Sequence, residues 1–245
     1  MNKPMIVQYW HSGVPPVEVA ELMQTWESAR AEGFAYRCFD DASAMDFLRA
    51  HYDRRTVAAY ASCGVPAMRA DFFRICALLT SPGIYVDADM RRTGAGYRPF
   101  FKKDKLVPLL PLWERLERGL LFKRDARVAN GFMIVKQTQD ILLQAILAAA
   151  VENIESRSSN NVYLVTGPGI ATKWLAKLGV LHAYFRAFEF WTADDLAPYV
   201  RLVGRLPYKR SDDHWVNAQQ VGSIFVNPSA QGSEPLAIER TADRK

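Results

Sequence analysis

Cysteine is scarce in this chain, with three residues in a length of 245. Cys38, Cys63 and Cys76 form no CxxC pair and show no spacing typical of metal ligands. The pattern therefore argues against a cysteine-based metal site. Three scattered thiols are typical of a protein in a reducing compartment.

Long hydrophobic runs are also absent. The longest apolar stretch, residues 141–151, is interrupted by Gln144 and lies between Asp140 and Glu152. It is too short to span a bilayer, which takes about 20 apolar residues. The first fifteen residues also lack the apolar core of a signal peptide. We therefore expect a cytoplasmic protein without a membrane anchor, at most peripheral to a membrane.

Basic residues outnumber acidic ones by 31 to 26, which gives a net charge of +5 and a pI near 9.1. This bias fits anionic partners such as a nucleotide diphosphate or an anionic membrane surface, although it also serves solubility alone. No nucleic-acid partner is expected. With 49% hydrophobic residues, the chain is predicted to form one domain over residues 1–226, followed by a polar, flexible tail at 227–245.

The most informative stretch is residues 67–90, AMRADFFRICALLTSPGIYVDADM. It predicts a helix, a tight turn and an apolar strand that ends in Asp87 and Asp89. Side chains alternate along a strand, so both carboxylates should share one face, with Cα atoms about 6.5 Å apart. Carboxylates at the carboxyl end of a sheet lie where open α/β sheets bind ligands, and they can hold a hard divalent cation.

The helix before this strand carries a second charged pair. Its apolar positions recur at helical spacing: Met68, Phe72, Ile75 and Leu79. Asp71 and Arg74 are three residues apart and are therefore neighbours on the helix. Such a pair is commonly a surface ion pair. Its position just before the two strand-end carboxylates favours a role in the same site.

Elsewhere, strand and helix patterns alternate. Strands are predicted at 5–9, 34–39, 131–136 and 162–165, and helices at 17–31, 41–51, 56–62, 139–154 and from residue 66. This order predicts an α/β fold with a Rossmann-like, mainly parallel sheet flanked by helices.

The stretch around the two carboxylates resembles the sugar-nucleotide-binding region of glycosyltransferases with a DXD motif. Family 32 is the most similar, with its yeast α-1,6-mannosyltransferases and vertebrate α-1,4-galactosyltransferases; the clostridial glucosylating toxins share the segment. The matching residues are Ala70, Asp71, Arg74, Leu78, Gly83, Ile84, Tyr85, Asp87 and Asp89. The chain departs from the pattern at Pro82, where the family usually has glycine.

Three further blocks extend the resemblance. Residues 5–16 resemble the family's opening strand and proline-containing loop, residues 130–133 its N-G-x-[IM] block, and residues 166–168 its T-G-P block. Four matches in the same order are far more specific than a lone DXD. Beyond about residue 180 the correspondence is loose.

This resemblance implies a GT-A-type fold and a hexosyltransferase that depends on Mn²⁺ or Mg²⁺ and retains anomeric configuration. The implied donor is a UDP- or GDP-sugar. The implied acceptor is a saccharide or a lipid-linked acceptor, as in polysaccharide biosynthesis. Asp71, Arg74, Asp87 and Asp89 would be the catalytic residues, with Asp87 and Asp89 holding the metal and Asp71 and Asp87 holding sugar hydroxyls.

The resemblance also implies donor-binding residues: Gln8, Trp10, Tyr85, Asn130 and Gly131. Trp10 would stack on the nucleobase, unless it packs in the core as tryptophan commonly does. His214 lies in a late segment, residues 211–217, with Trp215. It is predicted as a further metal ligand, with an ordinary surface histidine as the alternative.

Two other functions fit parts of the pattern. A non-catalytic nucleotide-sugar-binding protein could derive from a transferase, but the intact acidic residues and Arg74 argue against it. A phosphatase of the haloacid-dehalogenase type also uses a strand-end DxD. Such enzymes place it near the N-terminus and follow it with Thr or Val, where this chain has Arg91.

Overall fold

The computed structural model describes residues 3–101, 109–111, 128–178, 189–204, 206–210, 219–220 and 222–227. The predicted tail at 227–245 lies outside these residues apart from Asn227. Within the described part, none of the helices combines the length and apolar character needed to cross a membrane.

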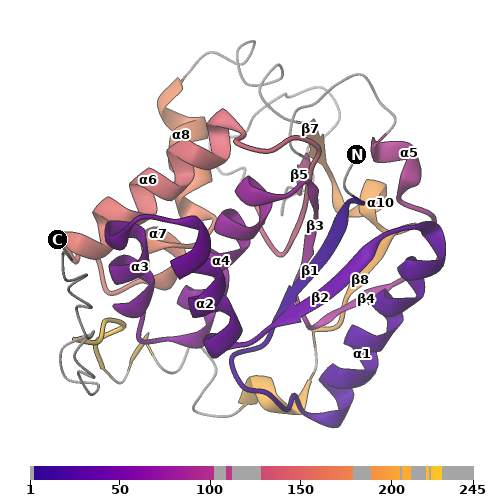
Figure 1. The fold of residues 1–245 in the computed structure, drawn as a ribbon, viewed down its shortest axis with the longest axis horizontal. Helices are drawn as coiled ribbons and strands as arrows, with labels where there is room; N and C mark the ends of the chain where they lie inside the picture. Colours follow the sequence, from indigo (N-terminus) through magenta and orange to yellow (C-terminus); the bar gives the residue numbers. More distant parts are fainter. Residues whose placement is uncertain are drawn as a thin grey trace, which may run out of the picture.

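A six-stranded sheet forms the centre of the fold, in the order β2-β1-β3-β6-β5-β7 (Figure 1). Its strands are β1 (Met5–Tyr9), β2 (Ala35–Phe39), β3 (Gly83–Val86), β5 (Leu109–Pro111), β6 (Phe132–Val135) and β7 (Glu189–Trp191). The pairs β1–β2, β1–β3 and β5–β7 are parallel, whereas β6 runs antiparallel to β3 and β5. The predicted α/β fold with a mainly parallel sheet is confirmed, with β6 as an antiparallel insertion.

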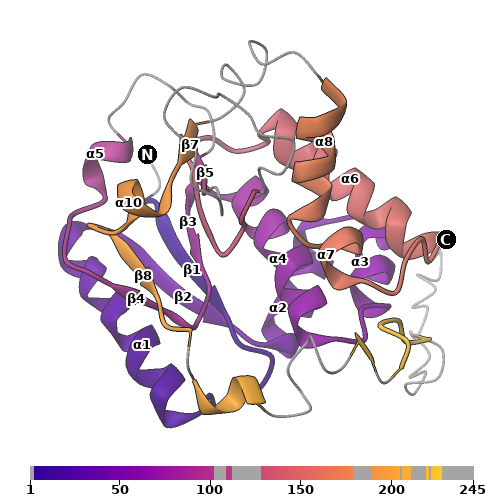
Figure 2. The same cartoon turned by 180° about the vertical axis from the view of Figure 1, so that it is seen from behind.

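Helices cover both faces of this sheet (Figures 1 and 2). One layer holds α2 (Asp41–His51), α3 (Arg54–Ala61), α4 (Pro66–Thr80), α6 (Ile141–Glu155), α7 (Val162–Val165) and α8 (Gly169–Leu178). The other holds α1 (Val17–Glu27), η1 (Ser28–Glu32), α5 (Arg98–Phe101), α10 (Ala193–Leu196) and a small sheet of β4 (Met90–Arg92) and β8 (Val200–Leu202).

Alternation along the strands divides the core between these layers. Tyr85 packs with the α4 side, while its neighbours Ile84 and Val86 pack with the α1 side. All four residues of β3 are buried. A continuous apolar strand of this kind is expected where helices cover both faces of a sheet.

Local sequence signals account for several helix starts. Asp40 and Ser43 form a capping box at α2, Asp140 caps α6, and Pro66 occupies the first turn of α4. Residues 162–165 were predicted as a strand, which is wrong. They form α7, because the Asn161 side chain accepts a hydrogen bond from the Tyr163 amide and so starts a helical turn.

Candidate active site

The DXD segment turns immediately after β3. The strand ends at Val86, the Asp87 amide donates to the Gly131 carbonyl at 2.7 Å, and the Met90 amide donates to the Asp87 carbonyl at 3.1 Å. The expectation that the strand continues through Asp87 and Asp89 is therefore wrong, since β3 ends at Val86 and a turn follows Asp87. Both carboxylates still lie at the carboxyl end of β3, each with its own cationic partner.

Arg74 of α4 is the centre of the first half of the site. Its Nη2 lies 2.9 Å from Asp71 Oδ1 and 3.1 Å from Asp87 Oδ1, and its Nη1 donates to the Asn130 carbonyl at 2.5 Å. The guanidinium also lies over the ring of Tyr85, 4.4 Å from the centroid. Arg74 is only 3% exposed, so the surface ion pair considered for Asp71 and Arg74 is wrong.

The two carboxylates bound by Arg74 carry more negative charge than one guanidinium offsets. Burial raises the pKa of Asp71, while Arg74 and the side-chain amide of Asn130, which donates to Asp71 Oδ1 at 2.8 Å, lower it. Burial also raises the pKa of Asp87 to about 6; Arg74 opposes that shift, and Asp89 and Asp71 add to it. Excess negative charge in a buried position favours binding of a further cation.

This shift predicts how Asp87 affects folding. Because its pKa is raised above its ordinary value of 3.8, its contribution to stability is fully present below pH 4 and is lost as the pH rises through 6. The wild-type protein should therefore lose free energy of unfolding relative to Asp87→Asn between pH 4 and pH 6. Denaturant titrations of both proteins at each pH measure this. A wild type that gains stability over this range would show that Arg74 outweighs burial.

Asp89 forms the second half of the site. Its Oδ2 lies 2.6 Å from Nζ of Lys209, in the 3₁₀ helix η2 (Pro207–Arg210), and its backbone carbonyl accepts from the Val203 amide at 3.0 Å. The other carboxylate oxygen, Oδ1, is buried and has no hydrogen-bond partner among the described residues. A buried anionic oxygen without a partner is costly, so this atom is suited to hold a cation.

The donor atoms fit a divalent ion that is completed by substrate. Within the described residues, no three histidine, cysteine or acidic side chains converge to form a metal cage. Mg²⁺ is commonly bound by one or two carboxylates together with waters and substrate phosphates. Asp89 Oδ1, with the neighbouring Asp87 carboxylate, matches that requirement.

Gln8 and Tyr85 are buried next to Asp87 and Arg74. Gln8 is fully buried; its Nε2 contacts the Asp87 carbonyl at 3.5 Å, and its Oε1 accepts from the Tyr36 hydroxyl at 2.8 Å. Tyr85 is 1% exposed beneath Arg74. The predicted role of Gln8 and Tyr85 in donor binding stays a prediction; Gln8 contacts the Asp87 carbonyl, and Tyr85 lies against the Arg74 guanidinium.

Trp10 follows β1 at the same edge of the sheet. Its ring lies edge-on to Tyr208, with 5.2 Å between centroids, and its indole N–H is buried with no partner among the described residues. Trp10 is half-buried, so both stacking on a base and packing stay open. His214 lies outside the described residues, and its predicted role stays a prediction.

Gly131 packs directly on the carboxylate of Asp87. A Cβ atom at this position would lie 2.5 Å from Asp87 Oδ2 and 2.7 Å from the terminal methyl of Met90. We expect Gly131→Ala to displace the Asp87 carboxylate and to lower kcat/KM at least about tenfold. Gly13→Ala is the matched control, because a Cβ there meets nothing within 4 Å. Equal activity of the two variants would show that the position of Asp87 is not critical.

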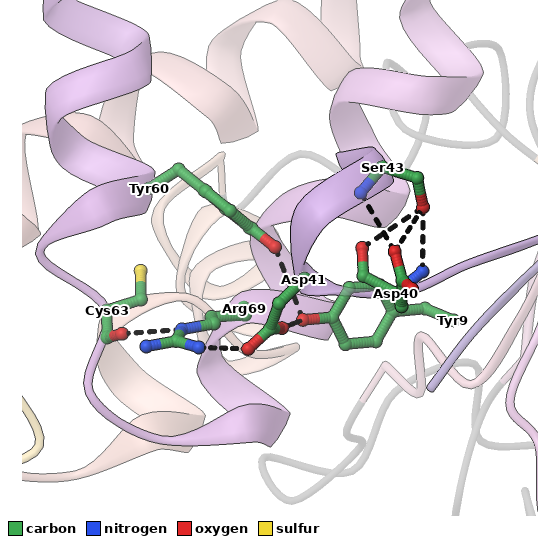
Figure 3. Close-up of polar contacts among 7 residues, drawn as sticks. All are labelled: Tyr9, Asp40, Asp41, Ser43, Tyr60, Cys63 and Arg69. Carbon is green, nitrogen blue, oxygen red and sulfur yellow. Dashed lines mark hydrogen bonds and ion pairs between the residues drawn. The ribbon is translucent and has the colours of Figure 1, made fainter. Parts of the chain in front are cut away.

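A cluster of hydrogen bonds and one ion pair connects the end of β1 to the helices packed beside it (Figure 3). The Asp41 carboxylate accepts from the Tyr9 hydroxyl through one oxygen and from Arg69 through the other. The Tyr9 and Tyr60 hydroxyls are 3.2 Å apart, and Arg69 Nε donates to the Cys63 carbonyl at 2.8 Å. The cluster ties α2, α3 and α4 to the end of β1, immediately before Trp10.

We expect Asp41→Ala to destabilise the protein by about 1–3 kcal/mol, because it leaves the Arg69 guanidinium without its carboxylate. The control is Asp46→Ala on the same helix, whose side chain is 77% exposed and should matter little. Thermal and chemical denaturation of both variants measure the difference. Equal stability would show that the cluster is dispensable for folding.

Lys209 and Tyr208 are site residues that the sequence pattern did not identify. Their only signal was a basic pair, Lys209-Arg210, far along the chain from the DXD segment. A small apolar cluster brings them there: Val19, Leu22 and Met23 of α1 pack with Ala88 and Leu206. The motif turn and η2 therefore share one packing unit.

Comparison with known proteins agrees with this geometry. Residues 7–94 match the family model described as a glycosyltransferase sugar-binding region containing a DXD motif. The matched region contains Asp71, Arg74, Asp87 and Asp89, which supports the prediction of a glycosyltransferase. The assignment to family 32 and the relation to the clostridial toxins stay predictions.

Other comparisons give fold-level likeness at most. No curated protein matches the chain significantly. The solved structure of the PaToxG glycosyltransferase is 14% identical, with 91% of this chain and 89% of that chain covered and a TM-score of 0.48. A glycosyltransferase involved in glycosylation of the major capsid of PBCV-1 is 8% identical, with coverage of 87% and 99% and a TM-score of 0.46. Likeness this low carries no activity over to this chain.

Proposed function

We propose that this protein is a metal-dependent glycosyltransferase that moves a hexose from a UDP- or GDP-sugar to a saccharide or lipid-linked acceptor. One observation carries the proposal. At the end of β3, Arg74 holds Asp71 and Asp87 in a buried network, while Asp89 keeps one buried oxygen without a partner among the described residues. The first half suits a sugar and the second suits a cation with its diphosphate.

Asp89, together with Asp87, would hold Mn²⁺ or Mg²⁺, which supplies Lewis-acid stabilisation to a diphosphate leaving group. The remaining chemistry comes from the chain itself. Arg74 fixes the Asp71 and Asp87 carboxylates so that they can accept hydrogen bonds from sugar hydroxyls. Because the Arg74 site is buried, its charges act at low dielectric and need little reorganisation during the reaction.

Glycosyl transfer places developing positive charge on the sugar ring. Asp71 lies against Gly167, whose added Cβ would stand 3.1 Å from Asp71 Oδ2. The backbone at residues 166–168 therefore lies beside the Asp71 carboxylate. In this proposal, that carboxylate faces the sugar ring on which the positive charge develops. Retention of anomeric configuration is part of the proposal and rests on the resemblance to family 32.

The test is a donor screen with UDP- and GDP-sugars in the presence of Mn²⁺, in which the released nucleoside diphosphate is assayed. The proposal expects release from one donor class, stopped by excess chelator. Donor binding without any release, with or without acceptor saccharides, would favour the non-catalytic binding protein. Absence of donor binding across the screen would contradict both functions.

A further inference from the structure

Lys209 occupies half of the carboxylate that is proposed to hold the metal. Its ammonium lies 2.6 Å from Asp89 Oδ2, and the two side chains are only 20% and 14% exposed. The same ammonium donates to the Val203 carbonyl at 3.4 Å. Asp89 therefore pairs one carboxylate oxygen, Oδ2, with the ammonium of Lys209. Its other oxygen, Oδ1, has no hydrogen-bond partner among the described residues.

The surrounding segment fixes this ammonium in place. The Val203 amide donates to the Asp89 carbonyl at 3.0 Å, and the Lys209 amide donates to the Leu206 carbonyl at 3.1 Å. Tyr208 packs edge-on against Trp10. Burial raises the pKa of its hydroxyl, and the Asp89 and Asp87 carboxylates add to that shift. Three contacts therefore fix the position of Lys209: its backbone bond to Leu206, the packing of the adjacent Tyr208 on Trp10, and its own ion pair with Asp89.

We propose that Lys209 is a positioning residue that shares Asp89 with the metal and weakens binding of the metal alone, so that the metal binds together with the diphosphate. This inference rests on the proposed function. Its basis is charge: three carboxylates, Asp71, Asp87 and Asp89, face two fixed cations, Arg74 and Lys209. The formal sum is −1, which is too little to neutralise a divalent ion.

A bound diphosphate changes this balance. Its negative charge offsets both the metal and Lys209, so that the two cations no longer oppose each other through Asp89. Without Lys209 the site would carry a formal charge of −2, enough to neutralise a divalent ion by itself. Lys209 therefore makes metal binding depend on the nucleotide. Because it occupies Asp89 Oδ2, Oδ1 is the Asp89 oxygen that can bind the ion.

The test measures Mn²⁺ binding directly, by the electron paramagnetic resonance signal of the free ion, without nucleotide. Lys209→Met should bind Mn²⁺ at least tenfold more tightly than the wild type. With Mn²⁺ saturating, the same variant should bind the nucleoside diphosphate at least tenfold more weakly. Lys209→Arg keeps the charge and should stay near wild type. Lys173→Met, which removes an exposed lysine on α8, is the matched control.

The outcomes separate this inference from the proposed function. If Asp89→Asn loses Mn²⁺ binding in the presence of the nucleoside diphosphate, but Lys209→Met without nucleotide binds Mn²⁺ no more tightly than the wild type, the inference alone is overturned. If Asp89→Asn binds Mn²⁺ as well as the wild type when the nucleoside diphosphate is present, both proposals fall. Should Lys209→Met melt at a much lower temperature, Lys209→Gln replaces it, since its amide can still donate to Asp89.

Discussion

Replacement of Asp89 by asparagine is expected to reduce turnover at least about 1000-fold, or about 4 kcal/mol of transition-state stabilisation, in a protein that remains folded. An amide supplies no anionic ligand to a hard divalent ion. It can still accept the hydrogen bond that Lys209 donates to Asp89 at 2.6 Å, so local structure should persist. Steady-state kinetics with the active donor, together with circular dichroism and melting, measure both effects.

The matched control for this variant is Asp194→Asn, which removes an exposed carboxylate on α10. It should retain wild-type kinetics. The idea of a metal-dependent site fails if Asp89→Asn keeps full activity, or if the wild type does so in excess chelator.

Loss of either partner in the Asp71–Arg74 pair is expected to lower kcat/KM at least about tenfold, and loss of both should cost much less than the product of the single losses. The two side chains act as one unit, since Arg74 and Asn130 both bind Asp71 Oδ1. Arg74→Ala should also reduce the free energy of unfolding by about 3–5 kcal/mol, because it leaves buried carboxylates unpaired.

Arg74→Lys separates these effects. Its ammonium keeps the charge but cannot reach Asp71, Asp87 and the Asn130 carbonyl at once, as the guanidinium does. We expect most of the stability to return and most of the activity to stay lost. Losses that multiply in the Asp71→Ala, Arg74→Ala double variant would show that the two side chains act independently. Full activity in Arg74→Lys would show that the pair serves folding alone.

Much of the fold was predictable because local signals and the global pattern agree. The predicted helix starts at residues 41 and 66 are confirmed by α2 and α4, whereas α6 begins at Ile141, two residues after its predicted start, because Asp140 caps it. The antiparallel direction of β6 was not predictable, since an apolar strand reads alike in either direction. The helix at 162–165 was missed because a four-residue apolar run fits both a strand and one helical turn.

The site was predictable where its residues are close in sequence, and at Asn130 and Gly131 through the family resemblance alone. Asp71, Arg74, Asp87 and Asp89 lie within nineteen residues, and the structure brings the first three into one network. The extended conformation predicted for the two motif carboxylates was wrong, because β3 ends at Val86 and the Met90 amide donates to the Asp87 carbonyl in a turn. Lys209 could not be inferred, since only tertiary packing brings η2 to the motif.

The central claim is that Asp89 and its neighbours form a site for a divalent ion and a nucleoside diphosphate at the end of β3. Crystals grown with Mn²⁺ and the nucleoside diphosphate of the active donor test it through the anomalous scattering of manganese. We expect one strong peak within coordinating distance of Asp89 Oδ1, with the diphosphate on its other side. A diphosphate bound elsewhere, or a manganese peak that does not contact Asp89, would contradict it.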